Sequence, residues 1–167
     1  MFGGSFEHSL DAAGRFVMPA RFRLHLGETF VVTKGIGCIA VFTRETANKL
    51  DEELNQVGNM LSLLLDPNVS ALHRHFFSGM VEIGADKQFR VQLSPELRRY
   101  AGIQNEIVIR GCGKFIELWN PQLLEMYEQK NAQVENLISA GSAILGHIAE
   151  QQPTEQDADA PQAGSAE

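Results

Sequence analysis

A short pattern that occurs twice constrains this chain more than any other feature. Asp11 stands four residues before Arg15, in a polar turn between two runs of alternating apolar residues. Asp86 and Arg90 repeat that spacing in the same kind of context. Self-similarity at a fixed offset indicates one structural unit used twice.

The elements expected around each pattern repeat in the same order. Apolar alternation on both sides of each turn is typical of a β-hairpin. A short helix, a second hairpin around a Gly-x-Gly turn and a longer helix follow. We expect the first set at residues 6–18, 20–26, 30–42 and 43–57, and the second set at 81–93, 94–98, 107–119 and from 120 onward.

Neither half has enough strands to bury its own apolar face, so the halves should pack on each other around an approximate two-fold axis. With 167 residues and a hydrophobic fraction of 44%, one α+β domain is the expectation. The predicted parts are a first half at 5–57, a helical connector at 58–79, a second half at 80–140 and a disordered acidic tail at 151–167.

The net charge of −7 argues at first against a nucleic-acid partner, but the charge is unevenly placed. Residues 151–167 carry four acidic residues and no Lys or Arg. Near the first turn, bases outnumber acids: Arg15, Arg21, Arg23 and Lys34 against Glu7, Asp11 and Glu28. A local basic surface on an acidic protein is therefore consistent with the sequence.

Several classes of protein are disfavoured. No apolar run reaches the length of a membrane span, no export signal is present, and two cysteines are too few for a disulfide framework, so we expect a cytoplasmic protein. The motifs HExxH, CxxC and GxSxG are absent, and the Gly-x-Gly turns lack the residues of a phosphate loop. We expect no enzyme activity, no cofactor, no metal site and no small-molecule substrate.

The residues around both turns resemble the MraZ family of bacterial transcriptional regulators from Met1 to roughly residue 145. The matching residues are Met1-Phe2, Gly4, His8, Leu10-Asp11, Gly14-Arg15, Pro19 to Arg23, Asp86 to Gln88, Arg90, Pro95 to Arg98 and Ala101-Gly102. The resemblance implies two AbrB-like half-domains that form a swapped-hairpin β-barrel with flanking helices. It also implies a ring-shaped homo-oligomer in the nucleoid. Such a ring would bind tandem TGGG-type boxes in double-stranded DNA and usually repress its own promoter and the division and cell wall cluster.

The resemblance assigns DNA binding to Asp11, Arg15, Asp86 and Arg90. A guanidinium can bond the O6 and N7 of guanine together in the major groove, whereas each Asp would orient its Arg or pin the turn. The alternative interpretation of a single Asp-x-x-x-Arg pattern is an exposed ion pair that contributes little to stability and has no role in binding DNA. Phosphate contacts are expected from five further basic residues, Arg21, Arg23, Lys87, Arg98 and Arg99.

The chain departs from the family pattern at two positions. Ala13 stands where a Lys is common, and Phe89 stands where Gly is usual. Because Phe tolerates positive φ poorly, we expect the second turn to be the place where this chain differs from its relatives. The Leu-rich helices around 46–65 and 121–138 are candidates for ring contacts. The competing functional hypothesis is an oligomeric protein-interaction module that does not bind DNA.

Overall fold

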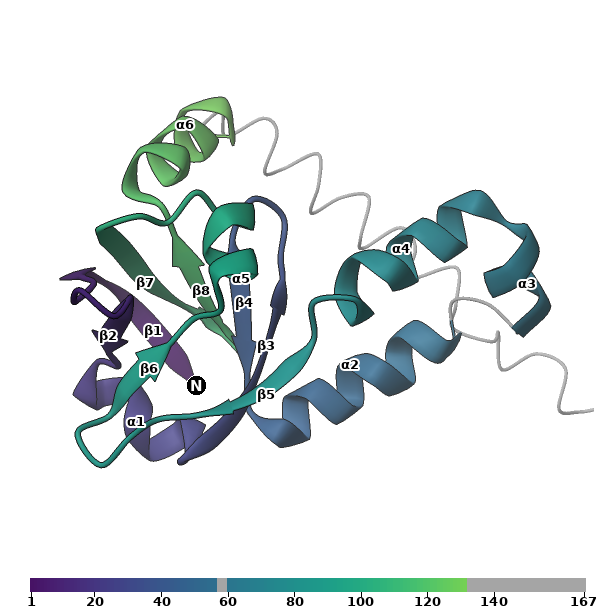
Figure 1. Ribbon diagram of the computed structural model, residues 1–167. Coiled ribbons are helices and arrows are strands. Elements are labelled where there is room, and N and C mark those ends of the chain that lie inside the picture. Colours follow the sequence, from purple (N-terminus) through teal and green to yellow (C-terminus); the bar gives the residue numbers. More distant parts are fainter. Residues whose placement is uncertain (57–59, 132–167) are drawn as a thin grey trace, which may run out of the picture. The chain divides into compact units, whose positions relative to one another are not determined.

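The structure is a computed structural model that describes residues 1–56 and 60–131 (Figure 1). Met1–Glu125 make one compact unit, which holds both turns. The described residues form an α+β fold with eight strands and six helices. The predicted tail at 151–167 and the end of the second half, 132–140, lie outside the described residues.

The predicted order of elements occurs twice. The first set consists of β1 (Phe2–Ser9), β2 (Arg15–Val17), α1 (Ala20–Leu26), β3 (Thr29–Lys34), β4 (Ile39–Phe42) and α2 (Arg44–Gln56). The connector holds α3 (Met60–Leu65) and α4 (Pro67–Phe77). The second set consists of β5 (Val81–Gly84), β6 (Arg90–Gln92), α5 (Pro95–Tyr100), β7 (Glu106–Gly113), β8 (Ile116–Trp119) and α6 (Pro121–Asn131).

Strands of the first half pair with strands of the second half. Six antiparallel strands run in the order β1-β7-β8-β4-β3-β5, and β2 pairs with β6 in a separate two-stranded ribbon. The hairpins β3–β4 and β7–β8 form as expected. The hairpins expected at 6–18 and 81–93 are wrong, because β1 pairs with β7 and β5 pairs with β3. Alternation indicates which face of a strand is buried but does not identify the strand that bonds to its edge.

The expected barrel closure is not seen in the hydrogen-bond pattern of residues 1–56 and 60–131. The larger sheet ends at β1 on one side and at β5 on the other, and the β2–β6 ribbon stays separate from it. The ribbon shares the core of the large sheet through Phe16 and Val91, which lie opposite each other and are both fully buried. The ribbon is thus anchored by one face and leaves the other face to solvent.

Short helices after the ribbon strands are defined by local sequence. Pro19 precedes α1, whose Phe22 and Leu26 are four residues apart and both buried. Gly27, at φ +80°, ends the helix. In the second half the Ser94 hydroxyl caps α5 by accepting a hydrogen bond of 3.2 Å from the Leu97 amide. Both helices therefore bury one apolar side beneath the sheet.

The two halves differ in how well they fill their cores. In the first half, the Phe6 and Phe22 rings meet edge to face with centroids 5.3 Å apart. Val81 and Leu97 occupy the corresponding positions of the second half, and both line an open hollow of about 340 Å³. The two halves therefore resemble each other in backbone and hydrogen bonds but differ in how their apolar side chains pack.

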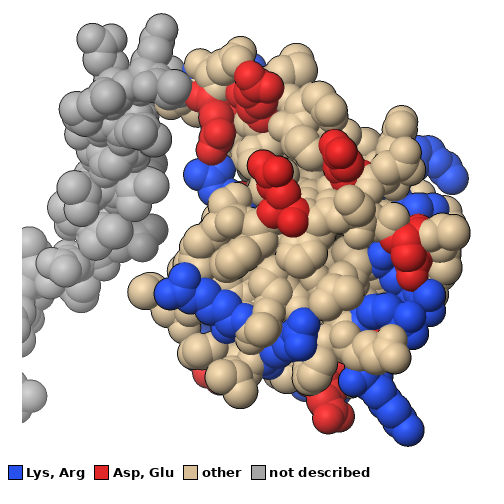
Figure 2. Space-filling model, turned by 90° about the vertical axis from the view of Figure 1, so that its left-hand side faces the viewer, with Lys and Arg blue, Asp and Glu red and all other residues tan. Residues whose placement is uncertain are grey.

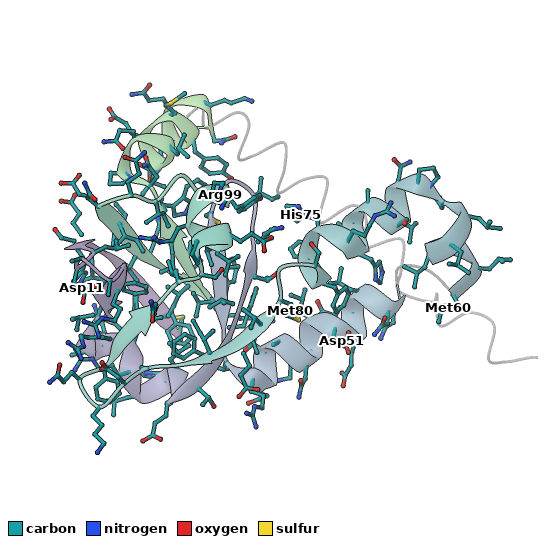
Figure 3. The ribbon with its side chains drawn as sticks, in the orientation of Figure 1. Asp11, Asp51, Met60, His75, Met80 and Arg99 are labelled. Carbon is teal, nitrogen blue, oxygen red and sulfur yellow. The ribbon has the colours of Figure 1, made fainter. Side chains whose placement is uncertain are left out.

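The helical connector is anchored by histidines. His73 Nε2 lies 2.9 Å from the Leu54 carbonyl oxygen of α2, and His75 Nε2 lies 2.9 Å from that of Gly35 beside β3 (Figure 3). Within the connector expected at 58–79, α4 begins at Pro67 and is capped by Asp66. The short α3 leaves apolar side chains exposed; these are Met60, Leu61, Leu64 and Leu65.

Candidate nucleic-acid interface

The first turn is closed by one carboxylate. Asp11 Oδ1 accepts hydrogen bonds of 2.9 Å from both the Ala13 and the Arg15 amides. Asp11 Oδ2 accepts one of 2.8 Å from Arg15 Nε and lies 2.8 Å from Arg15 Nη2. The Asp11 amide in turn donates to the Arg15 carbonyl, and Gly14, at φ +74°, donates to the Asp11 carbonyl. Asp11 marks this turn at the left of Figure 3.

The second turn repeats that arrangement bond for bond. Asp86 Oδ1 accepts hydrogen bonds of 2.8 Å and 2.9 Å from the Gln88 and Arg90 amides. Asp86 Oδ2 accepts one of 2.7 Å from Arg90 Nε. Phe89 takes the place of Gly14 at φ +56°, the one described non-glycine residue with a positive φ. The departure expected at Phe89 is therefore absent from the backbone, although a left-handed conformation costs such a residue roughly 1–2 kcal/mol.

The ribbon presents both arginines on one exposed face. Arg15 lies opposite Gln92, and Arg90 lies opposite Val17, so the two arginines are diagonal neighbours on one side of β2–β6. Diagonal partners of this kind have Cα atoms about 7–8 Å apart. The alternate residues, Phe16 and Val91, face the core. The fold thus brings together two arginines that are far apart in the sequence.

The Asp residues hold the arginines without hiding them. The backbone N–H of Arg15, then its side chain, lowers the pKa of the Asp11 carboxyl. The same groups of Arg90 lower the pKa of Asp86 to about 2. Each carboxylate is therefore ionised at neutral pH and grips the Nε side of its guanidinium. In the first turn Nη2 also contacts the carboxylate, since Arg15 Nη2 lies 2.8 Å from Asp11 Oδ2. Guanine O6 and N7 accept from two guanidinium N–H groups, which Nη1 and the second N–H of Nη2 can supply.

Comparisons with known proteins agree with the sequence resemblance. A family model described as "MraZ protein, putative antitoxin-like" matches residues 1–61 and 76–142, which include both turns. A protein from Acetivibrio thermocellus named "Transcriptional regulator MraZ" is 34% identical over 147 residues, which cover 87% of this chain and 99% of that protein. Proteins of the same name from Natranaerobius thermophilus and Carboxydothermus hydrogenoformans are 37% and 39% identical, over 82% and 76% of this chain and 94% and 86% of their own lengths.

The chain belongs to the MraZ family. The break in the family match, between residues 61 and 76, falls within α3 and α4 of the connector. The repeated units therefore carry the family pattern, and the connector is where this chain is least like it.

The remaining basic residues of this MraZ-family chain have different surroundings. Figure 2 shows Lys and Arg gathered in the lower part of the face that carries β1, β2 and α1. Arg21 and Lys87 are exposed, as a phosphate contact requires. Arg23 and Arg98 are partly exposed, as Arg15 and Arg90 are, but they contact the two turns. Sequence reasoning missed Gln92, which lies opposite Arg15 and donates to the Ala13 carbonyl at 3.3 Å; the period of two from Arg90 was the signal for it.

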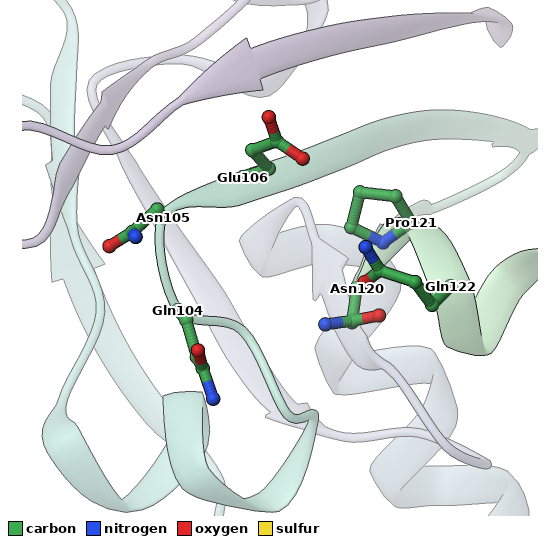
Figure 4. Close-up of a pocket in the computed structure, with 6 residues that line it drawn as sticks. All are labelled: Gln104, Asn105, Glu106, Asn120, Pro121 and Gln122. Carbon is green, nitrogen blue, oxygen red and sulfur yellow. The ribbon is translucent and has the colours of Figure 1, made fainter.

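A hollow in the second half offers few ionisable groups. It has a volume of about 250 Å³ and lies where β7 and α6 begin (Figure 4). Its lining residues are Gln104, Asn105, Glu106, Asn120, Pro121 and Gln122, of which Glu106 alone is ionisable. The Asn120 side chain already bonds the Gly102 carbonyl and the Leu123 amide. This hollow therefore lacks the paired groups that acid–base catalysis requires.

Residues 1–56 and 60–131 contain neither a cluster of metal-binding side chains nor a membrane-spanning helix. No group of three or more His, Cys, Asp or Glu side chains is placed to hold a metal ion there. Within the same residues, no helix combines the length and apolar character that crossing a bilayer needs. Cys38 and Cys112 are free thiols, and burial raises their pKa to about 12 and about 11.

Proposed function

We propose that this chain is a sequence-specific DNA-binding transcriptional regulator whose reading element is the β2–β6 ribbon. The observation that carries the proposal is the placement of Arg15 and Arg90 on one exposed face, each held by an Asp through the same set of bonds. The major groove, about 12 Å wide, admits a two-stranded ribbon. Each Arg can then donate two hydrogen bonds to one guanine. The names of its relatives support a regulator of transcription.

The proposed targets are tandem TGGG-type boxes upstream of the chain's own gene and of the division and cell wall cluster, with repression as the outcome. One ribbon offers a small reading surface, so several protomers in a ring would gain affinity through effective concentration. Boxes about 10 base pairs apart would keep successive protomers on one side of the duplex. Such a protein would act on the nucleoid. Exposed apolar side chains on α3, such as Leu61 and Leu64, are candidate ring contacts.

A gel-shift titration on a duplex with tandem TGGG boxes tests the reading mechanism. The double variant Arg15→Ala with Arg90→Ala should bind at least about 30-fold more weakly, since each bidentate contact is worth about 1–3 kcal/mol. Arg74→Ala removes an exposed arginine from α4 and should bind like the parent. If the double variant binds the boxes as well as the parent, the ribbon does not read them. Footprinting upstream of the gene then tests the target and the spacing.

A second function is favoured by the exposed apolar side chains of α3, which are 62–73% accessible in Met60, Leu61, Leu64 and Leu65. In this reading the chain is an oligomeric module that binds another protein and not DNA, in keeping with its charge of −7. Sedimentation with and without the tandem-box duplex separates the two functions. An oligomer that fails to co-sediment with the duplex at low salt would support the interaction module.

A further inference from the structure

One arginine from each half of the fold reaches the turn of the other half. Arg23, on α1 of the first half, places its Cζ atom 4.7 Å from the ring centroid of Phe89 in the second turn. Arg98, on α5 of the second half, lies against Gly14 in the first turn. A Cβ atom added at Gly14 would come within 2.6 Å of Arg98 Nη1 and 2.9 Å of its Cζ.

These two arginines occupy equivalent positions in the repeat. Each follows a buried residue that anchors its helix, Phe22 before Arg23 and Leu97 before Arg98. The helices are thus fixed in the core, and their arginines reach outward to the back of a turn. The contact is the same in kind on both sides, a planar guanidinium laid against the left-handed residue of the turn.

We propose that Arg23 and Arg98 are positioning residues that brace the opposite turns, and that neither acts as a phosphate contact. This inference rests on the proposed function, because it concerns how the reading arginines are held. Arg98 braces Arg15 through Gly14, and Arg23 braces Arg90 through Phe89. Sequence reasoning placed both with the phosphate contacts, because exposure cannot be seen in the sequence.

The hydrogen bonds of the two guanidiniums support this role. Arg23 Nε donates a bond of 2.8 Å to the Met18 carbonyl, at the end of its own ribbon strand. Arg98 Nε is buried and has no hydrogen-bond partner among the described residues. Three guanidinium atoms of Arg98, Nη1, Cζ and Nε, lie close to the place that a Cβ of Gly14 would take, so packing on the turn is the contact that the geometry shows.

The bracing is crossed, and this gives it a signature that a general loss of stability lacks. Removing Arg98 should disturb Arg15, which belongs to the other half, and should leave Arg90 as it was. Removing Arg23 should do the reverse. A residue that merely stabilised its own half would disturb the turn of that half.

Nitrogen-15 NMR of the arginine Nε–H groups in the DNA-free protein tests this directly. In Arg98→Met, the Arg15 Nε–H signal should shift and exchange with solvent at least several-fold faster, whereas the Arg90 signal stays in place. Arg23→Met should reverse the pattern. Arg99→Met, a change at an exposed neighbour on α5, should move neither signal. Unchanged signals in both variants, or disturbance confined to the variant's own half, would overturn the proposal.

Arg98→Lys keeps the charge and removes the planar group, so it separates bracing from phosphate attraction and guards against an unfolded methionine variant. If Arg98 braces the turn, Arg98→Lys should resemble Arg98→Met in the NMR experiment and should weaken binding to the boxes about 10-fold. As a phosphate contact, it should leave both the NMR signals and the affinity close to those of the parent.

The salt dependence of DNA binding provides a further test of whether these arginines contact phosphates. Loss of one phosphate contact lowers the slope of log K against log salt by about 0.9. Lys87→Met should show that change, whereas Arg23→Met and Arg98→Met should weaken binding with the parent slope. A lowered slope in the latter two would overturn the bracing role. If the parent itself fails to bind the boxes, the proposed function fails, and the NMR arm still decides whether the turns are braced.

Discussion

The two turns differ at all three positions between Asp and Arg, and the change from Gly14 to Phe89 is the one that separates the needs of the turn from those of its surroundings. Asp11 and Asp86 each capture two backbone N–H groups and the Nε of an arginine, with nearly identical distances. Gly14 and Phe89 both adopt positive φ. The carboxylate therefore specifies the turn, and glycine is not required for it.

Glycine at position 14 has a second explanation in Arg98. The guanidinium occupies the space that a Cβ would fill, so a side chain at this position would collide with it. In the second turn the equivalent guanidinium, that of Arg23, lies on the ring of Phe89 instead. Phe89, which stands at the glycine position of the turn, is thus paired with an arginine that lies against its ring, and this contact of about 0.5–1 kcal/mol offsets part of the conformational cost.

The largest expected effect is on DNA affinity when the turns are disabled one at a time. Arg15→Ala and Arg90→Ala should each weaken binding to a tandem-box duplex by 1–3 kcal/mol, about 5- to 150-fold, because the same bonds hold both arginines. Fluorescence anisotropy at fixed salt measures both variants against Arg74→Ala. A tenfold difference between the two single variants would show that the turns do not read DNA equally.

Gly14→Ala should destabilise the fold by about 1–3 kcal/mol, since it combines positive φ with a collision against Arg98. Gly113→Ala is the matched control, because Gly113 has φ +78° and nothing within 4 Å of its added Cβ. Thermal or denaturant unfolding of both variants gives the difference. Equal losses of stability would mean that Arg98 imposes no constraint on position 14.

Phe6→Val should cost about 1–2 kcal/mol of unfolding free energy, because it removes the ring that packs on Phe22. The reciprocal change, Val81→Phe, should fill the 340 Å³ hollow beside Leu97 and stabilise the fold by up to about 1 kcal/mol. Denaturant midpoints report both. Destabilisation by Val81→Phe would show that the halves cannot be packed alike.

Phe89→Gly should change stability by less than about 1 kcal/mol. The variant relieves the left-handed backbone, roughly 1–2 kcal/mol, but loses the Arg23 contact and gains chain entropy when unfolded. Calorimetry of Phe89→Gly and Gly14→Ala compares how much the residue with positive φ contributes to stability in each turn. A large loss would mean that the ring contributes more than its contact with Arg23.

The smallest effect is expected from pH. The folded-state pKa of Asp86, about 2, lies below its ordinary value of 3.8, so its stabilising contribution is present above about pH 4 and is lost as pH falls through 2. The pKa of Asp11 is shifted in the same direction. Neither carboxyl should titrate between pH 5 and 8, and carboxyl carbon-13 shifts can follow both. Arg90→Met should raise the Asp86 midpoint only in part, because a backbone N–H is the main cause of the shift.

The sequence predicted the order of the elements and both Asp-x-x-x-Arg turns, because alternation, helix ends and repeats are local signals. The sequence did not predict which strands pair with each other. Phe6 and His8 alternate with polar neighbours whichever strand bonds to β1, so the local reading chose β2, whereas β1 pairs with β7. The sequence also did not predict the contacts of Arg23 and Arg98, because each of them contacts a turn that is far away along the chain.

The exchange of strands between the halves also bears on how the chain is synthesised. Phe2 pairs with Gly113, so the first strand made by the ribosome bonds to one of the last strands of the sheet. At about 5–20 residues per second, β1 waits roughly 5–20 seconds for its partner to emerge. The N-terminal half cannot complete its sheet during that interval, and the fold is finished only when almost all of the described chain exists.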